Sequence, residues 1–201
     1  MDIALIILIG YLMGSIPFAL VIGKVFYKTD VRQHGSKNLG GGNTGRVLGK
    51  KAGVAVMTCD ILKVAFVVLL AKLFTKGDLG IVLGSIAAAI GHCYPIFARF
   101  KGGKAVATMY GFLFGLFVFV TFDPLLFFLP LIAFLIILYF TKIVSLSSML
   151  SSIVIVIYVF ITMDSLAIQL ALVFFSLLII VRHYKNIQRM IKHEENKISW
   201  M

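Results

Sequence analysis

Residues 125–181 read LLFFLPLIAFLIILYFTKIVSLSSMLSSIVIVIYVFITMDSLAIQLALVFFSLLIIV, and their only charged side chains are Lys142 and Asp164. Two short polar breaks divide this stretch into three apolar segments, which are residues 125–141, 148–163 and 165–181. A helix that crosses a membrane needs about 20 predominantly apolar residues. The stretch therefore predicts three membrane helices, and the tight turns between them indicate that neighbouring helices run antiparallel.

The rest of the chain has the same character. Of its 201 residues, 61% are apolar and 13% are charged, whereas soluble proteins have roughly 45–50% and 25%. This composition excludes a water-soluble domain. Four further apolar segments cover residues 3–23, 52–71, 79–98 and 105–122. The prediction is an all-α, polytopic membrane protein with seven transmembrane helices in one domain, residues 1–201. A five-span version with two re-entrant segments is the lesser alternative.

The distribution of charge orients the predicted helices. Cytoplasmic loops of membrane proteins are enriched in Lys and Arg. With the N-terminus outside, seven spans place sixteen of the nineteen Lys and Arg residues on the inside, in loops 24–51 and 99–104, at Lys142 and in the C-terminal tail. We therefore expect an outside N-terminus and a cytoplasmic C-terminus. The net charge of +11 indicates anionic partners, and in a membrane protein these are lipid headgroups or phosphorylated substrates rather than nucleic acid.

The first inside loop combines glycine with polar side chains. Residues 30–46 contain five glycines, the donors Ser36, Asn38 and Asn43, and the cation Arg46. Glycine admits positive φ angles and lets successive N–H groups converge on one anion. A flexible basic linker on anionic lipid is the alternative. The interleaving of donors with glycine favours a phosphate or carboxylate site.

The second inside loop, FKGGK at residues 100–104, sets two glycines between Lys101 and Lys104 at a predicted helix start. Exposed N–H groups and the positive end of the helix dipole favour an anion there. The loop lacks the glycine and the hydroxyl of a Walker A motif, which would stand at Ala98 and Ala105, so ATP hydrolysis gets little support. Orientation of the following span by positive charge is the alternative role of the two lysines.

Two further inside features lie near helix ends. The serine cluster at residues 145–152 opens the sixth predicted span, where serine commonly caps a helix. His183 precedes Asn186 and Arg189 in the tail. A histidine close to an anion site can orient or deprotonate a hydroxyl group, although a lone histidine is more often structural.

Several residues predict how the helices pack. The spacings Gly10-x-x-x-Gly14 and Gly111-x-x-x-Gly115 allow helix backbones to approach closely. Pro17 should kink the first apolar helix, and the Ser15 hydroxyl is expected to help satisfy the freed carbonyl. Asp60 and Lys63 lie on one face of the second predicted span and are expected to pair with each other, since ionised groups at that depth need a partner. A proton or ion relay is the alternative, which is disfavoured because no further carboxylate continues a path at that depth.

Taken together and in order, these motifs resemble one known family. They are Gly14-Ser-Ile-Pro17, Gly35-Ser36-x-Asn38-x-Gly40-x-x-Asn43-x-x-Arg46, Gly91-His92-x-x-Pro95, Phe100-Lys-Gly-Gly-Lys104-x-Val-Ala-Thr108, the Ser145 cluster and His183-x-x-Asn186-Ile-x-Arg189. The sequence resembles the bacterial acyl-phosphate-dependent glycerol-3-phosphate acyltransferases over nearly its whole length. It departs from the family pattern at Lys37, Ala105 and His193, where the pattern has glycine, and at Gly41 and Gly42, where it has alanine and threonine.

The resemblance implies transfer of a fatty acyl group from acyl phosphate to the sn-1 hydroxyl of glycerol 3-phosphate, in the bacterial plasma membrane with the site facing the cytoplasm. It implies that His183, Lys104 and Ser36 are catalytic. The substrate-binding residues it implies are Asn38, Gly40, Gly41, Gly42, Asn43, Arg46, His92, Lys101, Gly102, Gly103, Thr108, Ser145, Ser147, Ser148 and Asn186. The expected partners are acyl phosphate, glycerol 3-phosphate and membrane lipid, with no cofactor, metal or nucleic acid, and the expected form is a monomer.

Two other function classes remain open on sequence grounds. A transporter or flippase for an anionic lipid or phosphorylated metabolite would use similar basic loops but needs access from both membrane faces. All polar motifs lie on one predicted side, which disfavours this class. A structural protein that binds anionic lipid is the second alternative, and it predicts no catalytic effect of mutations in the phosphate-binding motifs.

Overall fold

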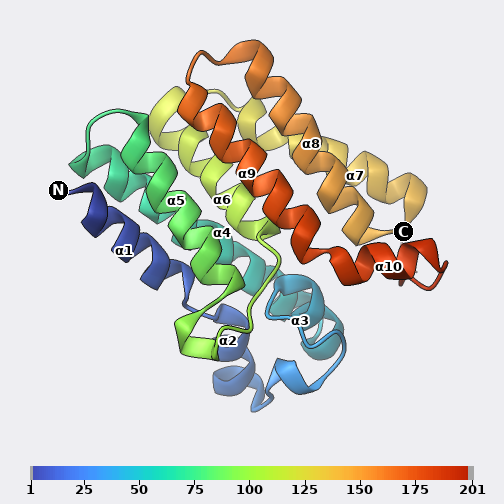
Figure 1. The fold of residues 1–201 in the computed structure, drawn as a ribbon. Helices are drawn as coiled ribbons and strands as arrows, with labels where there is room; N and C mark the ends of the chain where they lie inside the picture. Colours follow the sequence, from blue (N-terminus) through green and yellow to red (C-terminus); the bar gives the residue numbers. More distant parts are fainter. Residues whose placement is uncertain (1, 199–201) are drawn as a thin grey trace.

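The computed structural model describes residues 2–198, and these residues form helices and no β-strand. Figure 1 shows most of the helices running up and down side by side in one bundle. The α-helices are α1 (Ile3–Gly14), α2 (Phe18–Tyr27), α3 (Gly41–Leu48), α4 (Lys50–Phe74), α5 (Asp78–Cys93), α6 (Val106–Leu116), α7 (Leu125–Thr141), α8 (Val144–Thr162), α9 (Leu166–Arg182) and α10 (Tyr184–Ile191). Short 3-10 turns cover Val31–Gln33 and Ile96–Ala98, and a π-helical turn, Phe117–Thr121, extends α6.

Helices lie over all seven of the apolar segments, but they differ in length. The segments Ile3–Tyr27, Lys50–Phe74, Asp78–Ala98 and Val144–Thr162 are long and apolar enough to cross a membrane. A fifth crossing is possible if α9 and α10, which meet at a 56° bend, count as one span. The helices Val106–Thr121 and Leu125–Thr141 are apolar, but each is shorter than the 18 residues taken here as the minimum for crossing a membrane. The helical membrane architecture is confirmed, and the count of seven spans stays a prediction.

The helices are joined by a buried apolar core. α4 packs against α1, α3, α5 and α6, and α8 packs against both α7 and α9. At the centre the rings of Phe112 on α6 and Phe175 on α9 stack with centroids 5.4 Å apart, and both are fully buried. Large apolar side chains also face outward, and Phe140 and Ile161 are each 78% exposed. Such an apolar exterior suits lipid rather than water.

The predicted close approaches between helices are present. A side chain on Gly10 or Gly14 of α1 would collide with the backbone of α5, at Gly84 and Ala88 respectively. A side chain on Gly111 of α6 would collide with the Ile61 carbonyl of α4. The small residues therefore let these backbones touch, as helix association in membranes requires.

At Pro17, where a kink is predicted, the structure has a full break that separates α1 from α2 and leaves Ile16 outside both helices. The expectation for Ser15 was wrong, because its buried hydroxyl has no hydrogen-bond partner within the described part of the chain. The ammonium of Lys63 instead donates to the Ile16 carbonyl at 3.0 Å. Lys63 can replace the serine because its long side chain reaches from α4 to the break.

Two helices were not expected. α3 lies inside the glycine-rich first loop, and Gly41 and Gly42 form its first turn rather than a freely bending segment. α3 packs closely on α4, since a side chain on Gly53 would lie 2.7 Å from the Gly45 Cα atom. α10 follows α9 after His183. Figure 1 shows α3, the start of α6 and the α9–α10 bend at the same end of the bundle.

Candidate active site

Asn43 organises the first loop. Its amide nitrogen donates to the carbonyls of Val31 at 3.1 Å and His34 at 3.3 Å, and its amide oxygen accepts from the Ser36 backbone N–H at 2.8 Å. Only 2% of Asn43 is exposed. All of these polar atoms are bonded within the loop, so the structure places Asn43 as a support for Ser36 rather than as a free donor.

Ser36 is therefore held at the surface of the loop next to a cation. The Arg46 guanidinium on α3 donates to the Ser36 hydroxyl oxygen at 3.3 Å, and both residues are exposed. Gly42 beside them is exposed, and a side chain added there would meet nothing within 4 Å. A phosphorylated molecule can thus approach the Ser36–Arg46 pair from outside the protein.

The second loop is held in place by hydrogen bonds to the backbone of Gly102 and Gly103. The Gly103 N–H donates to the His92 carbonyl at 2.9 Å. The Arg182 guanidinium donates to the carbonyls of Gly103 at 3.0 Å and Gly102 at 3.3 Å. It also lies over the Tyr94 ring at 5.0 Å, in a cation–π contact. These contacts connect the loop before α6 to the end of α9.

Lys104 follows this clamped loop and reaches α10. Its ammonium donates to the Asn186 amide oxygen at 2.5 Å, across 82 residues of sequence. Burial lowers the pKa of Lys104 to about 8; the positive charges of Arg189, Arg46 and Arg182 contribute to this, and Glu195 opposes it.

His183 stands at the bend between α9 and α10, and only 4% of it is exposed. Its Nδ1 lies 2.8 Å from the Ile179 carbonyl oxygen. A carbonyl can only accept, so Nδ1 carries the proton and Nε2 of the neutral ring has a free lone pair. Burial, with the charge of Lys104, lowers the pKa of His183 to about 4. The ring is therefore neutral near pH 7.

Glu195 lies in one hydrogen-bonded group with Asn186, Lys104, Ser145 and Arg189, which we call the Lys104 cluster. Glu195 was not identified as a site residue from the sequence. Its carboxylate accepts from the Asn186 amide at 2.5 Å, the Ser145 hydroxyl at 2.8 Å and the Arg189 guanidinium at 2.7 Å. Burial raises its pKa, but these hydrogen bonds outweigh burial and leave the pKa below its usual value. Because Asn186 donates to Glu195, its amide oxygen is turned toward Lys104. No motif signalled this role, because two adjacent glutamates in a polar tail look solvated.

The remaining predicted residues fall into two groups, those buried inside the protein and those exposed or partly exposed at its surface. The hydroxyls of Thr108, Ser147 and Ser148 are buried and donate to backbone carbonyls of their own segments, at 2.9 Å in each case. None of these serines caps α8. His92 is buried beneath Gly103. The side chain of Lys101 is exposed, and Asn38, Gly40 and Gly41 lie partly exposed in the first loop.

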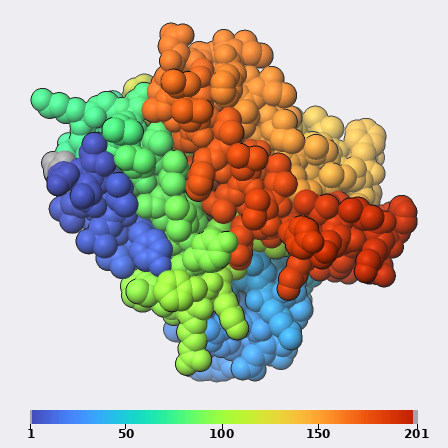
Figure 2. Space-filling view, viewed as in Figure 1, coloured from blue at the N-terminus to red at the C-terminus, as the bar shows by residue number. Residues whose placement is uncertain are grey.

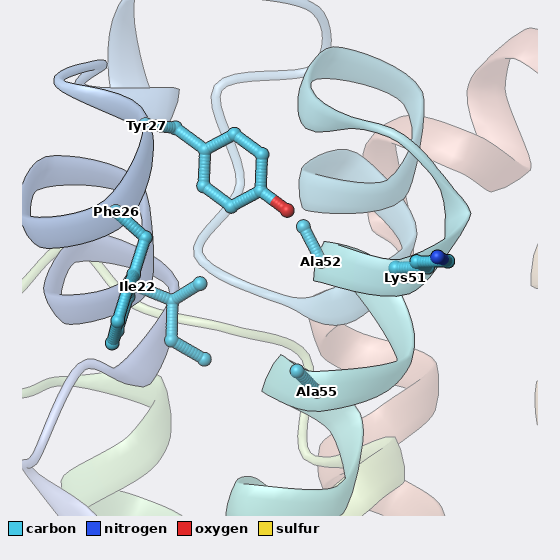
Figure 3. A pocket seen from close by; sticks show the side chains of 6 residues that line it. All are labelled: Ile22, Phe26, Tyr27, Lys51, Ala52 and Ala55. Atoms are coloured by element: carbon cyan, nitrogen blue, oxygen red, sulfur yellow. The ribbon is translucent and has the colours of Figure 1, made fainter.

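Two surface hollows lie beside α2 and are not lined by the residues of this cluster. One, of about 450 Å³, is lined by Lys24, Lys28, Asp30 and Gln33. The other, of about 440 Å³, lies between α2 and α4 and is lined by Ile22, Phe26, Tyr27, Lys51, Ala52 and Ala55. Figure 3 shows the Tyr27 ring reaching from α2 toward Ala52.

The geometry brings residues from three distant stretches to one end of the bundle. Figure 2 shows the C-terminal helix directly above the surface formed around α3. Within residues 2–198, no group of three or more His, Cys, Asp or Glu side chains is placed to hold a metal ion. The fold and the cluster define a class: helical membrane proteins with a cationic, glycine-lined site at one end of the bundle.

Comparison with known proteins identifies the family within this class. The family model described as glycerol-3-phosphate acyltransferase matches residues 4–193. The chain is 46% identical over 198 residues to the glycerol-3-phosphate acyltransferase of Geobacillus kaustophilus (strain HTA426), covering 98% of this chain and 96% of that protein. It is 44% identical over 201 residues to that of Bacillus subtilis (strain 168), covering all of both chains.

Solved structures agree with this match. The fold resembles the crystal structure of PlsY (YgiH), an integral membrane glycerol 3-phosphate acyltransferase, in its glycerol 3-phosphate form. The TM-score is 0.91 at 33% identity, with 99% of this chain and 96% of that chain covered. The lysophosphatidic acid form of PlsY gives a TM-score of 0.88. The chain belongs to the glycerol-3-phosphate acyltransferase family.

Proposed function

We propose that this protein transfers a fatty acyl group from acyl phosphate to the sn-1 hydroxyl of glycerol 3-phosphate, and releases lysophosphatidic acid and inorganic phosphate. The contact between Lys104 and Asn186 carries the proposal, because it joins the glycine loop to the helix that begins beside His183. Both proposed reactants bear phosphate. A cationic cluster with exposed Ser36 and Arg46 beside it offers donors for two phosphate groups.

The chemistry requires no covalent enzyme intermediate. The sn-1 hydroxyl oxygen attacks the acyl carbon, the bond from that carbon to the phosphate oxygen breaks, and phosphate departs with the bonding electron pair. His183 Nε2 accepts a hydrogen bond from the hydroxyl and orients it or assists its deprotonation, and the proton leaves with the departing phosphate. The acyl phosphate is already activated, so positioning supplies much of the rate and is worth up to about 7–11 kcal/mol in favourable cases.

Cations and N–H donors lower the barrier further. Lys104 and Arg46 stabilise the phosphate leaving group, and N–H groups of the first glycine-rich loop stabilise the developing oxyanion. Ser36 and Asn186 orient the substrates. The neutral state and the tautomer of His183 fit the role of hydrogen-bond acceptor for the attacking hydroxyl, since Nε2 is not used in the hydrogen bond to Ile179.

The same proposal includes the membrane arrangement. All seven apolar helices cross the bilayer, the N-terminus lies outside, and the site faces the cytoplasm of a bacterial plasma membrane. The two short helices are 16 and 17 residues long, which falls near the lower limit of about 17–25 for a span. The protein acts as a monomer in one domain, with the fatty chain between helices in the lipid.

One assay tests the proposal. The purified protein is incubated with radiolabelled glycerol 3-phosphate and either palmitoyl phosphate or palmitoyl-CoA, without ATP or added metal. Labelled lysophosphatidic acid is expected with palmitoyl phosphate, together with an equal amount of inorganic phosphate. Product from palmitoyl-CoA alone would contradict the assignment of the donor. Absence of product with either donor would contradict the whole proposal and favour a lipid-binding or transport role.

A further inference from the structure

A cluster of charged residues lies buried in the bundle, outside the machinery proposed above. Asp60 and Lys63 on α4 and His92 on α5 are 1%, 3% and 6% exposed. The Lys63 ammonium lies 2.6 Å from Asp60 Oδ1, as predicted for this pair, and 3.2 Å from His92 Nδ1. Buried charges are costly unless they are paired and fully hydrogen-bonded. Their presence among apolar helices therefore calls for a role.

Each donor hydrogen of the Lys63 ammonium group has an acceptor within hydrogen-bond distance. A lysine ammonium has three donor hydrogens, and three acceptors surround this one: the Asp60 carboxylate, the Ile16 carbonyl and His92 Nδ1. No donor remains for a ligand or for a proton relay. The cluster ties together α4, α5 and the break between α1 and α2, so it fixes the orientation of the His92 ring.

The opposite edge of that ring supports the glycine loop. A side chain on Gly103 would collide with His92 Nε2, and a side chain on Gly102 would collide with the His92 carbonyl. The Gly103 N–H also donates to that carbonyl at 2.9 Å. Arg182 holds the two glycines through their carbonyl oxygens. The backbone immediately before Lys104 is thus fixed between the His92 ring and the Arg182 guanidinium.

We propose that Asp60, Lys63 and His92 are positioning residues, which set the location of the Lys104 ammonium by holding His92 against Gly103. The inference rests on the proposed function and adds a specific role for groups that do not reach the substrates. A shift of the loop would move the Lys104 ammonium away from Asn186. Misplacement of a binding group by about 1 Å can cost up to about 100-fold in rate.

Two variants test the inference from opposite sides of the contact. His92→Gln keeps polar atoms but removes the ring, and Gly103→Ala leaves the buried cluster intact while adding a methyl group against the ring. In both, kcat/KM for palmitoyl phosphate is expected to fall about tenfold or more, because the displaced Lys104 ammonium stabilises the phosphate leaving group less well. The inhibition constant for inorganic phosphate should rise in parallel. Ser85→Ala, on α5 with a buried hydroxyl that has no hydrogen-bond partner within residues 2–198, is the control and should change neither.

The outcomes separate this inference from the proposed function. If the wild-type protein forms no lysophosphatidic acid, the proposed function fails. If the wild-type protein is active and a folded His92→Gln or Gly103→Ala variant keeps its kcat/KM for palmitoyl phosphate and its phosphate inhibition constant within twofold, the positioning role is overturned. A fall in kcat/KM without a rise in the phosphate inhibition constant overturns it as well. Should His92→Gln fail to fold, Gly103→Ala decides alone.

Discussion

The Lys104 ammonium donates to the Asn186 amide oxygen at 2.5 Å, while the Asn186 amide nitrogen donates to Glu195 at 2.5 Å. These two hydrogen bonds fix the Asn186 amide in one orientation. The position of Glu195 in the C-terminal tail therefore helps to determine where the Lys104 ammonium is held. Lys104→Ala should lower kcat/KM for acyl transfer by at least about 100-fold, because both a charge and a charge-assisted hydrogen bond are lost. Lys185→Ala, on the exposed face of α10, is the matched control and should keep wild-type kinetics. Equal kinetics of the two variants would remove Lys104 from the site.

The pKa of Lys104 predicts an alkaline limit of activity. An ordinary lysine stays charged to about pH 10, whereas Lys104 loses its proton above its lowered pKa of about 8. As pH rises through this value, kcat/KM should fall about tenfold per pH unit, since kcat/KM reports the ionisation of the free enzyme. Lys104→Arg keeps its charge at these pH values, and its residual activity should show no such fall. A wild-type profile that stays flat to pH 10 would contradict the assigned role.

Three departures from the family pattern coincide with left-handed backbone. Lys37, Ala105 and His193 have φ angles of 59°, 62° and 58°, and the family pattern has glycine at each position. A left-handed conformation costs a residue with a side chain roughly 1–2 kcal/mol relative to glycine. Ala105→Gly should therefore stabilise the protein by about 1 kcal/mol, although glycine makes the unfolded chain more flexible. The measurement is the unfolding temperature in one detergent.

Ala107→Gly is the control for this test, since Ala107 lies within α6. Glycine in a helix is destabilising by roughly 0.5–1 kcal/mol relative to alanine. The two substitutions should therefore shift the unfolding temperature in opposite directions. Shifts of the same sign would show that backbone strain at Ala105 does not limit stability.

The tight contact between α1 and α5 predicts a large loss of stability. Gly14→Ala places a methyl group into the Ala88 carbonyl, and overpacking of this kind costs typically 1–3 kcal/mol. Gly45→Ala on α3 is the control, because its added carbon would lie 3.5 Å from the Gly53 Cα atom, an ordinary contact. Thermal unfolding in detergent should distinguish them. Equal stability of the two variants would show that α1 and α5 adjust without cost.

The sequence predicted features that depend on local composition. Apolar segments located the helices, and the pairing of Asp60 with Lys63 is confirmed. Pro17 located the first interruption, although the structure has a full break there rather than the predicted kink. These succeeded because apolar length, the missing proline N–H and an i,i+3 spacing act within one or two turns of helix. Close approach at Gly10 and Gly111 followed in the same way from small residues four apart.

Features that depend on tertiary contacts escaped prediction. α3 was read as loop because its first turn is glycine, yet packing on α4 holds it helical. Glu195 lies in a polar tail, and only the fold brings it to Ser145 and Asn186. Asn43 and His92 stood among the predicted substrate contacts, whereas the structure buries both as supports for the loops that carry Ser36 and Lys104. A sequence motif identifies such residues, but it does not distinguish a residue that binds substrate from one that holds the binding loop in place.

The central claim is that Ser36 and His183, from opposite ends of the chain, act on one chemical step. A double-mutant cycle tests it directly: kcat/KM for transfer from palmitoyl phosphate is measured for wild type, Ser36→Ala, His183→Ala and the double variant. Residues that act as a unit are strongly non-additive, so the double variant should be little worse than the poorer single variant. Loss in the double variant equal to the product of the single losses, as expected for Ser36→Ala combined with the exposed Lys192→Ala, would contradict a common site.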